Sequence, residues 1–317
     1  MSYFIQNILD RIGQPDLLEQ LSKKLSGSDL NSLLLEVMRI KTSDCTPAQL
    51  LKHYQLNRFV KPADLPVMEL RQAELELLKI FQKCSFTPLE LSPVSILGAC
   101  SVVAPADQKK ILSALRGTEV LADATNAMAL HISDLKKTNA WIPKTPNDKL
   151  RFSTIQRHVR TQVIPGKGFT PHFKIGCLVT SGMDTGNFTF EREALTEHLK
   201  VMNEIFLTYY CVDHLSFRLL CRNGYPDSVR LAEKITEHAL QAMPDIIVNI
   251  VKEPEKDNAY YKGIQCKVDI KLHNRTFEIA DGGFVDWTQQ LLQNKKERFL
   301  IMGFGFEFMY RIANGLV

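Results

Sequence analysis

The chain has 317 residues, of which 45% are hydrophobic and 23% charged, with a formal net charge of +4. This is ordinary globular composition, and the mild charge neither requires nor excludes an anionic partner. No apolar run approaches the ~20 residues that span a bilayer, and the N-terminus has no apolar signal core. The seven cysteines are dispersed without a Cys-x-x-Cys pair, which favours reduced thiols over a disulfide framework. We therefore expect a soluble, cytoplasmic protein with no membrane contact.

Residues 1–60 show helical periodicity, and we predict that they form an N-terminal helical domain. Ser28 or Asp29 is the expected N-cap of one helix, and Thr46, followed by proline, is the expected N-cap of the next. The segment 58–66 contains two prolines and is typical of a linker.

Beyond the linker, residues 66–317 mix helical and strand-like patterns. Helices are predicted near 190–209 and 228–243, and residues 263–272, "GIQCKVDIKL", alternate apolar and polar side chains as a strand with one solvated face does. Further strand candidates are "HFKIGCLVTSG", "HLSFRLLCR", "DIIVNIVKE" and "RTFEIADGG". Because the strands cluster after residue 150 and do not alternate strictly with helices, we predict an α+β fold. Its antiparallel sheet would be flanked by helices, on one side.

A basic segment around a glycine turn is the first candidate site. Arg157, Arg160 and Lys167 flank the turn "PGKG", and arginines beside such a loop can bind phosphates or carboxylates in a bidentate manner. Three following side chains could stack on a base: Phe169, His172 and Phe173. A solvated hairpin with scattered charges explains the same pattern equally well.

Two further candidates lie elsewhere in the chain. Asp123 and Thr125 could hold an ammonium group, although capping a helix is the usual role of such residues. Tyr260 and Tyr261 could line a small pocket, although paired tyrosines more often pack half-buried.

Glycines mark two more places. Gly282 and Gly283 permit a close backbone approach, and their neighbour Asp281 is most simply a turn residue. In "FLIMGFGFEFMYRI", Gly303 and Gly305 lie where an apolar strand is predicted to turn into a helix. The eight histidines show no metal-ligand spacing, and no phosphate-binding Gly-x4-Gly-Lys or Gly-x-Ser-x-Gly motif occurs.

Taken in order, the segments over residues 66–312 resemble the catalytic core of class II aminoacyl-tRNA synthetases. The resemblance is greatest to the histidyl-tRNA synthetase branch, which includes the regulatory subunit of ATP phosphoribosyltransferase. "MELRQAELELLKIF" resembles the first family segment, which helps to form the dimer, and "LRFSTIQRHVRTQ" resembles motif 2. "AYYKG" and "DGGFVDW" resemble the histidine-specific segment and the stretch before motif 3, and "MGFGFEFMYRI" resembles motif 3.

The resemblance implies roles for individual residues. Arg157 would contact the α-phosphate and the substrate carboxylate, and Asp123 would receive the amino group. The amino-acid pocket would include these residues: Thr125, Lys256, Tyr260, Tyr261, Gly282 and Gly283. ATP would contact Arg157 together with these: Arg160, Lys167, His172, Phe173, Gly303 and Gly305.

The sequence also departs from the family pattern. Val159 replaces the acid of the Arg-x-Glu in motif 2. Counted from Gly303, the Glu-Arg pair of motif 3 falls on Met309 and Tyr310, with Arg311 one residue late. Lys256 stands where the histidine-specific segment has arginine, and the two cations are not interchangeable. The family's C-terminal anticodon-binding domain is expected to be absent.

These departures leave two functional hypotheses. The first is a dimeric paralogue that binds an amino acid, ATP or both in a regulatory or partner-dependent role, without charging tRNA. The alternative is an ATP-dependent, amino-acid-adenylating ligase that uses Mg²⁺ and transfers the product to a carrier or RNA, with Arg157 and Arg311 as catalytic residues. An α+β interaction protein without either ligand is a third interpretation.

Overall fold

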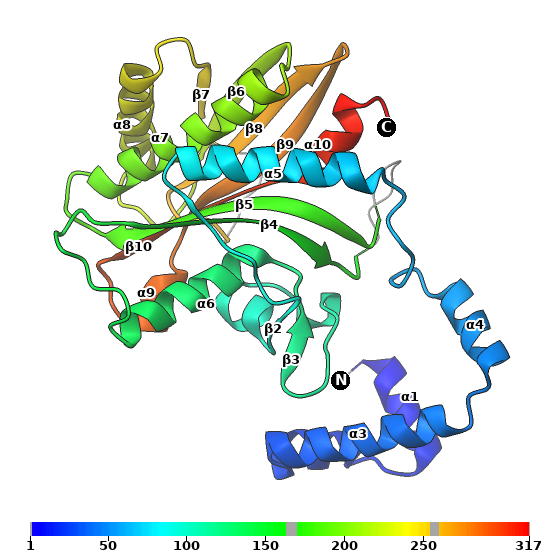
Figure 1. The fold of residues 1–317 in the computed structure, drawn as a ribbon. Helices are drawn as coiled ribbons and strands as arrows, with labels where there is room; N and C mark the ends of the chain where they lie inside the picture. Colours follow the sequence, from blue (N-terminus) through cyan, green and yellow to red (C-terminus); the bar gives the residue numbers. More distant parts are fainter. Residues whose placement is uncertain (1, 163–169, 254–259, 317) are drawn as a thin grey trace.

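The computed structural model describes residues 2–162, 170–253 and 260–316 (Figure 1). The described part forms an α+β body, from which the N-terminal helices extend as a separate arm in the view of Figure 1. None of the described helices is long and apolar enough to cross a membrane.

The N-terminal residues are helical, as predicted. The helices are α1 (Tyr3–Ile12), α2 (Leu17–Glu19), the π-helical turn η1 (Gln20–Lys24), α3 (Gly27–Ser43) and α4 (Pro47–Leu56). The prediction for the cap of α3 is wrong, because the side chain of Ser26 accepts from the amide of Asp29, so the helix begins earlier. Thr46 does cap α4, in a capping box with Gln49. Of these five segments, only Leu9 is buried; their folding as a separate domain stays a prediction.

The main sheet has eight strands in the order β1-β4-β5-β10-β9-β8-β6-β7. Its strands are β1 (Thr87–Pro88), β4 (Leu150–Val159), β5 (His172–Met183), β6 (His214–Cys221), β7 (Val248–Val251), β8 (Ile264–Leu272), β9 (Arg275–Val285) and β10 (Glu297–Phe304). The pairs β1–β4 and β6–β7 at the two edges are parallel, and all the others are antiparallel. The predicted α+β class is confirmed.

Helices cover both faces of the sheet, so the expectation of helices on one side is wrong. One face packs against α5 (Val67–Lys83), α7 (Thr189–Asn203) with the turn η4 (Glu204–Tyr209), α8 (Ser228–Ala242) and α10 (Phe306–Ala313). The other face packs against α6 (Ala124–Lys137) and α9 (Trp287–Leu292) (Figure 1). The physical reason is that the central strands are apolar on both sides: Leu300 and Met302 of β10 face the first layer, whereas Phe299 and Ile301 face the second.

A small outer layer follows β1. It consists of the antiparallel pair β2 (Val94–Ile96) and β3 (Thr118–Val120), with the π-helical turn η2 (Ala99–Val103) and the 3₁₀ turn η3 (Gln108–Lys110) between them. The buried carboxylate of Glu119 accepts from the amides of Gly98 and Cys100 at 2.9 and 3.0 Å, which ties η2 to β3. This layer ends at the N-terminus of α6.

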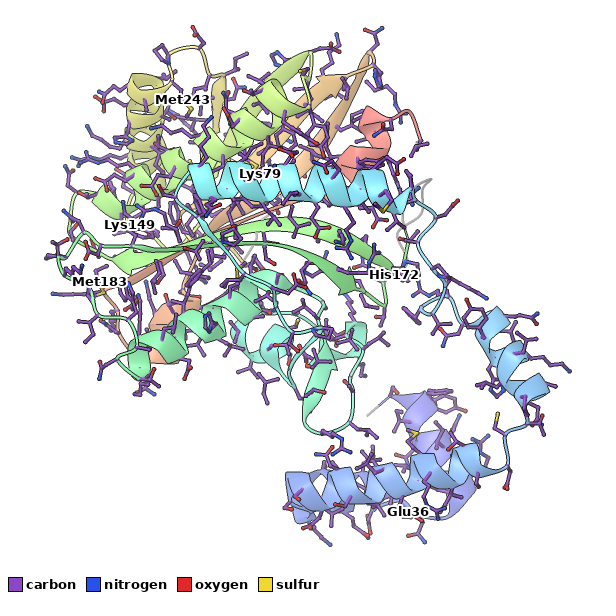
Figure 2. All side chains as sticks on the ribbon, viewed as in Figure 1. Glu36, Lys79, Lys149, His172, Met183 and Met243 are labelled. Carbon is purple, nitrogen blue, oxygen red and sulfur yellow. The ribbon has the colours of Figure 1, made fainter. Side chains whose placement is uncertain are left out.

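The segment between α4 and α5 contacts the sheet at its rim. Nε2 of His172 lies 2.6 Å from the carbonyl oxygen of Lys61, and the guanidinium of Arg311 donates to the carbonyl of Asp64 at 3.1 Å. Figure 2 shows His172 at the end of β5 that lies nearest this segment. The predicted linker is therefore fixed to the body through the start of β5 and through α10.

Candidate ligand-binding site

A cavity of about 650 Å³ lies on the sheet face that α6 covers, a volume that suits a small-molecule ligand. Its walls come from β4, β5, β9 and β10, from the N-terminus of α6, from η2 and η3, and from the tyrosine pair before β8. The N-terminus of α6 carries the partial positive charge of the helix dipole into this cavity. The site is thus built from elements far apart in sequence.

The first acidic group of the cavity is Asp123, the N-cap of α6. Its Oδ1 accepts from the amide and the hydroxyl of Thr125 at 2.8 and 2.7 Å, and its Oδ2 accepts from the hydroxyl of Tyr260 at 3.3 Å. Burial, and then the charge of Asp123, raise the pKa of Tyr260 well above its usual value, so this hydroxyl keeps its proton and remains a donor. The capping role expected of Asp123 is confirmed, and the same residue also lines the cavity; its contact with an ammonium group stays a prediction.

The second acidic group is Asp281, which the structure places in the middle of β9, opposite Gly303, and not in a turn. Its Oδ2 accepts from the hydroxyl of Tyr261 at 3.1 Å, and its Oδ1 accepts from the side-chain amide Nε2 of Gln265 at 2.7 Å. The guanidinium of Arg222 in turn donates to Oε1 of Gln265 at 2.6 Å, which fixes the orientation of that amide. Burial raises the pKa of Asp281.

The two tyrosines join these acidic groups on one wall. Their ring centroids are 4.9 Å apart, and Tyr260 also packs edge-on against Trp287 at 5.4 Å. Gly283 makes room for them, because a Cβ there would lie 2.5 Å from the carbonyl of Ile264 and 2.7 Å from the ring of Tyr261. Neither Gly283 nor Gly282 lines the cavity; their place is in the packing beneath it.

The cavity contains two buried polar groups that the sequence did not single out. Nε2 of His158 accepts from the amide of Ala124 at 2.9 Å, which assigns the proton to Nδ1, and burial lowers the pKa of this histidine to about 4. Asn126 donates to the thiol of Cys100 at 3.2 Å. Among the described residues, Nδ1 of His158 and Oδ1 of Asn126 have no hydrogen-bond partner. Both atoms are shielded from solvent, so they lie beneath the surface of the cavity.

Arg160 and Lys110 are the cations among the described residues that line the cavity. Nε of Arg160 donates to the carbonyl of Ala122 at 3.1 Å, and its guanidinium lies 5.6 Å from the ring centre of Phe173. It forms no ion pair with any acidic residue that the structure describes. Gln162, two residues further on, also lines the cavity.

The arginines expected to be catalytic lie elsewhere. Side chains alternate along β4, so His158 faces the cavity, and Arg157 faces the opposite layer. There Arg157 pairs with Glu307 of α10 at 3.1 Å and contacts Nδ1 of His172 at 2.9 Å. Arg311 lies 3.7 Å from Glu307 on the same side. None of these four residues of the opposite layer lines the cavity.

The predicted glycines of the strand-to-helix junction do line the cavity. β10 ends at Phe304 and α10 begins at Phe306, with Gly303 and Gly305 on either side of the last strand residue. A Cβ at Gly303 would come no closer than 3.6 Å to its nearest neighbour, so glycine here leaves the cavity open and is not required for packing. Lys167, Phe169 and Lys256 lie outside the described residues.

No group of metal-ligating side chains occurs in the portion of the chain that the structure covers. The described lining supplies four carboxylates, two tyrosines, a neutral histidine, two side-chain amides and two cations. Such a set binds a small polar ligand through hydrogen bonds and charge.

Solved structures identify the fold. The histidyl-tRNA synthetase of S. aureus matches with a TM-score of 0.58 at 11% identity, over 80% of this chain and 68% of that one. An ATP phosphoribosyltransferase regulatory subunit/histidyl-tRNA synthetase from Bacillus halodurans matches with a TM-score of 0.57 at 11% identity, over 82% and 83%. The RNA binding domain of threonyl-tRNA synthetase from Cryptosporidium parvum matches with a TM-score of 0.56 at 10% identity, over 77% and 63%. No protein-family model and no curated protein sequence matches the chain.

The similarity shows a class II aminoacyl-tRNA synthetase-like core, and at these identities it shows the fold alone. The predicted resemblance is confirmed at that level. Ligands and activity have to be argued from the cavity itself.

Proposed function

We propose that this chain is a class II synthetase-like paralogue whose cavity binds an amino acid, and that it acts in a regulatory or partner-dependent role without charging tRNA. One observation carries the proposal. Asp123 and Asp281 lie on one wall of the cavity with Arg160 also lining it, whereas Arg157 and Arg311 are bound to Glu307 on the other face of the sheet.

The cavity has a receptor for each charged group of an amino acid. The carboxylate of Asp123 is oriented by Tyr260 and Thr125, and it would accept from an ammonium group. The guanidinium of Arg160 forms no ion pair with the described residues, and it is suited to bind a carboxylate.

The same cavity is poorly equipped to stabilise a reacting phosphate. The family pattern places arginine directly after a glutamate in motif 3, and counted from Gly303 these two positions in α10 are Met309 and Tyr310. The described lining has four acidic residues against two basic ones: Asp107, Asp123, Glu278 and Asp281 against Lys110 and Arg160. Because adenylation depends on positive charge at the α-phosphate, this balance supports binding without activation.

A regulatory role is supported by the match to a protein described as a regulatory subunit, in which the same fold serves ATP phosphoribosyltransferase. We propose that this chain likewise works through a partner protein, as a homodimer built on the segment around α5. The seven described cysteines are all free thiols, which supports a reducing compartment such as the cytoplasm.

The alternative function, an ATP-dependent amino-acid ligase, is favoured by one observation. Arg160 and Gln162 both line the cavity, at the spacing of the Arg-x-Glu of motif 2 and with an amide in place of the acid. If the chain is a ligase, Arg160 would contact the α-phosphate, and Mg²⁺ would accompany ATP.

Isothermal titration of the full chain with each of the twenty amino acids, with and without MgATP, tests the proposal. We expect at least one amino acid to bind, and we expect Asp123→Asn to weaken it by about tenfold or more, since one buried charge-assisted hydrogen bond is lost. Asp227→Asn, which changes the N-cap of α8 away from the cavity, is the matched control. Absence of binding by every amino acid would overturn the proposal.

A further inference from the structure

Asp281 differs from its neighbour on the same strand in how its charge is compensated. Glu278 of β9 forms ion pairs with Arg218 at 2.8 Å and with Lys267 at 2.9 Å. Asp281 accepts only from the hydroxyl of Tyr261 and the amide of Gln265, both of which are neutral donors. Lys267, its register partner on β8, lowers the pKa of Asp281 through its charge. No described cation forms an ion pair with Asp281, and the ammonium group of Lys267 is paired with Glu278.

Burying an ionised carboxylate without an ion pair costs free energy, because hydrogen bonds from neutral groups replace only part of its hydration. Burial raises the pKa of Asp281, as expected when the charged form of a carboxyl group is destabilised. A positively charged ligand group beside Asp281 would offset the free-energy cost of burying this carboxylate.

The two carboxylates form separate receptors. Tyr260 donates to Asp123, whereas Tyr261 donates to Asp281, and the two rings lie 4.9 Å apart. The described lining of the cavity presents four carboxylates, of which Asp123 and Asp281 lie beside the tyrosine pair, against the guanidinium of Arg160 and the amine of Lys110.

We infer that the ligand is a basic amino acid with an aliphatic ammonium or guanidinium side chain, of the lysine, ornithine or arginine class. Its α-ammonium group contacts Asp123, its carboxylate contacts Arg160, and its second cation contacts Asp281. This inference rests on the amino-acid binding proposed above and names the class of ligand. A neutral amino acid would leave Asp281 uncompensated, and an acidic one would be repelled by it.

Competing ligands of matched shape test the inference. The wild-type chain is titrated with lysine, ornithine and arginine, with the neutral analogues norleucine and glutamine, and with cadaverine, which lacks the carboxylate. We expect the basic amino acids to bind about tenfold tighter or more than norleucine, and cadaverine to bind more weakly than lysine.

Two variants test whether Asp281 causes the preference for lysine over norleucine. In Asp281→Asn, which keeps the shape and one acceptor, the ratio between lysine and norleucine should fall towards one while norleucine binds as in the wild type. In Asp227→Asn, which makes the same substitution at the N-cap of α8 away from the cavity, the ratio should be retained. The wild-type series is decisive even if a variant is poorly folded, because it needs no substitution.

The outcomes distinguish failure of the proposed ligand class from failure of amino-acid binding itself. Equal binding of lysine and norleucine, unchanged in Asp281→Asn, would overturn the inference and leave the amino-acid site standing. Binding of cadaverine as tight as that of lysine would overturn the assignment of Arg160 to a carboxylate. No binding of any amino acid would overturn the proposed function together with the inference.

Discussion

Arg157 of β4 donates to the carboxylate of Glu307 in α10 at 3.1 Å, across the sheet face that lies opposite the cavity. The same carboxylate lies 3.7 Å from Arg311, and only 2% of its side chain is exposed. One buried glutamate thus engages both of the arginines that the sequence indicated as catalytic. Their position favours a role in fixing α10 to the sheet.

Glu307→Gln should therefore lower stability and leave ligand binding intact. Removing one partner of a buried ion pair typically costs about 3–5 kcal/mol, and we expect about 2–3 kcal/mol because Arg157 keeps some contact with solvent. Urea denaturation measures the change. Glu36→Gln, which breaks an exposed pair with Arg39 on α3, should leave the midpoint unchanged. Loss of amino-acid binding in Glu307→Gln at unchanged stability would contradict this assignment.

Arg157 of β4 and Arg160, the residue that directly follows the strand, should separate binding from stability. Arg160→Met should weaken amino-acid binding by about tenfold or more, because a cation that pairs with the ligand carboxylate is lost. Arg157→Met should destabilise the fold and leave the dissociation constant near that of the wild type. Calorimetric titration and thermal unfolding of both variants check the pair. Weaker amino-acid binding in Arg157→Met, with binding unchanged in Arg160→Met, would instead identify Arg157 as the ligand contact.

Two buried histidines should make the fold sensitive to acid. Burial lowers the pKa of His158 from 6.5 to about 4 and that of His198 to about 3. Between pH 6.5 and these values the unfolded chain binds more protons than the folded one, so the free energy of unfolding should decrease as the pH falls. The shift of His158 alone corresponds to about 3 kcal/mol.

Urea denaturation at several pH values between 4 and 7 measures this dependence. His158→Gln, which keeps an acceptor for the amide of Ala124, should flatten the curve over that range. His273→Gln, which removes a histidine from the exposed turn between β8 and β9, should reproduce the wild-type slope. An equal slope in His158→Gln and the wild type would rule out the neutral, buried form of His158.

Substitutions at two glycines should act on different properties. Gly303→Ala should change stability little, because the added methyl meets nothing closer than 3.6 Å, but it should weaken ligand binding by protruding into the cavity. Gly283→Ala should cost about 2 kcal/mol or more, because its methyl would lie 2.5 Å from the carbonyl of Ile264 and φ is +156°. Thermal unfolding together with titration distinguishes the two; a stable Gly283→Ala would show that β8 and Tyr261 can move apart.

Much of the fold was predictable because periodicity reports directly on burial. Ile264, Cys266 and Val268 alternate along β8 as expected and are buried in the layer of α5 and α7. The polar face of that strand was expected to be solvated, but Gln265 is buried, and its side-chain amide donates to Asp281. Alternation shows which residues share a face, but it does not show what covers that face.

The site was only partly predictable for the same reason. Asp123, Thr125, Tyr260 and Tyr261 could be named, because their order along the chain follows a known core. Choosing between Arg157 and Arg160 required knowledge of which face of β4 meets α6, and one residue of register reverses the answer. A partial signal did exist, since Arg160 and Gln162 have the Arg-x-acid spacing with an amide in the second position.

Other residues gave no local signal. Asp281 precedes two glycines, which is typical of a turn, yet a long strand runs through all three. Asn126 and His158 look like ordinary helix and strand residues, and only the fold brings them to the cavity.

Amino-acid-dependent exchange of pyrophosphate into ATP tests the central claim, binding without activation, most directly. The full chain is assayed with MgATP and each of the twenty amino acids at concentrations that saturate the site, beside Arg160→Ala. We predict no exchange above background with any amino acid, including those that bind by titration. Exchange with one amino acid that disappears in Arg160→Ala would contradict the account and establish an adenylating enzyme.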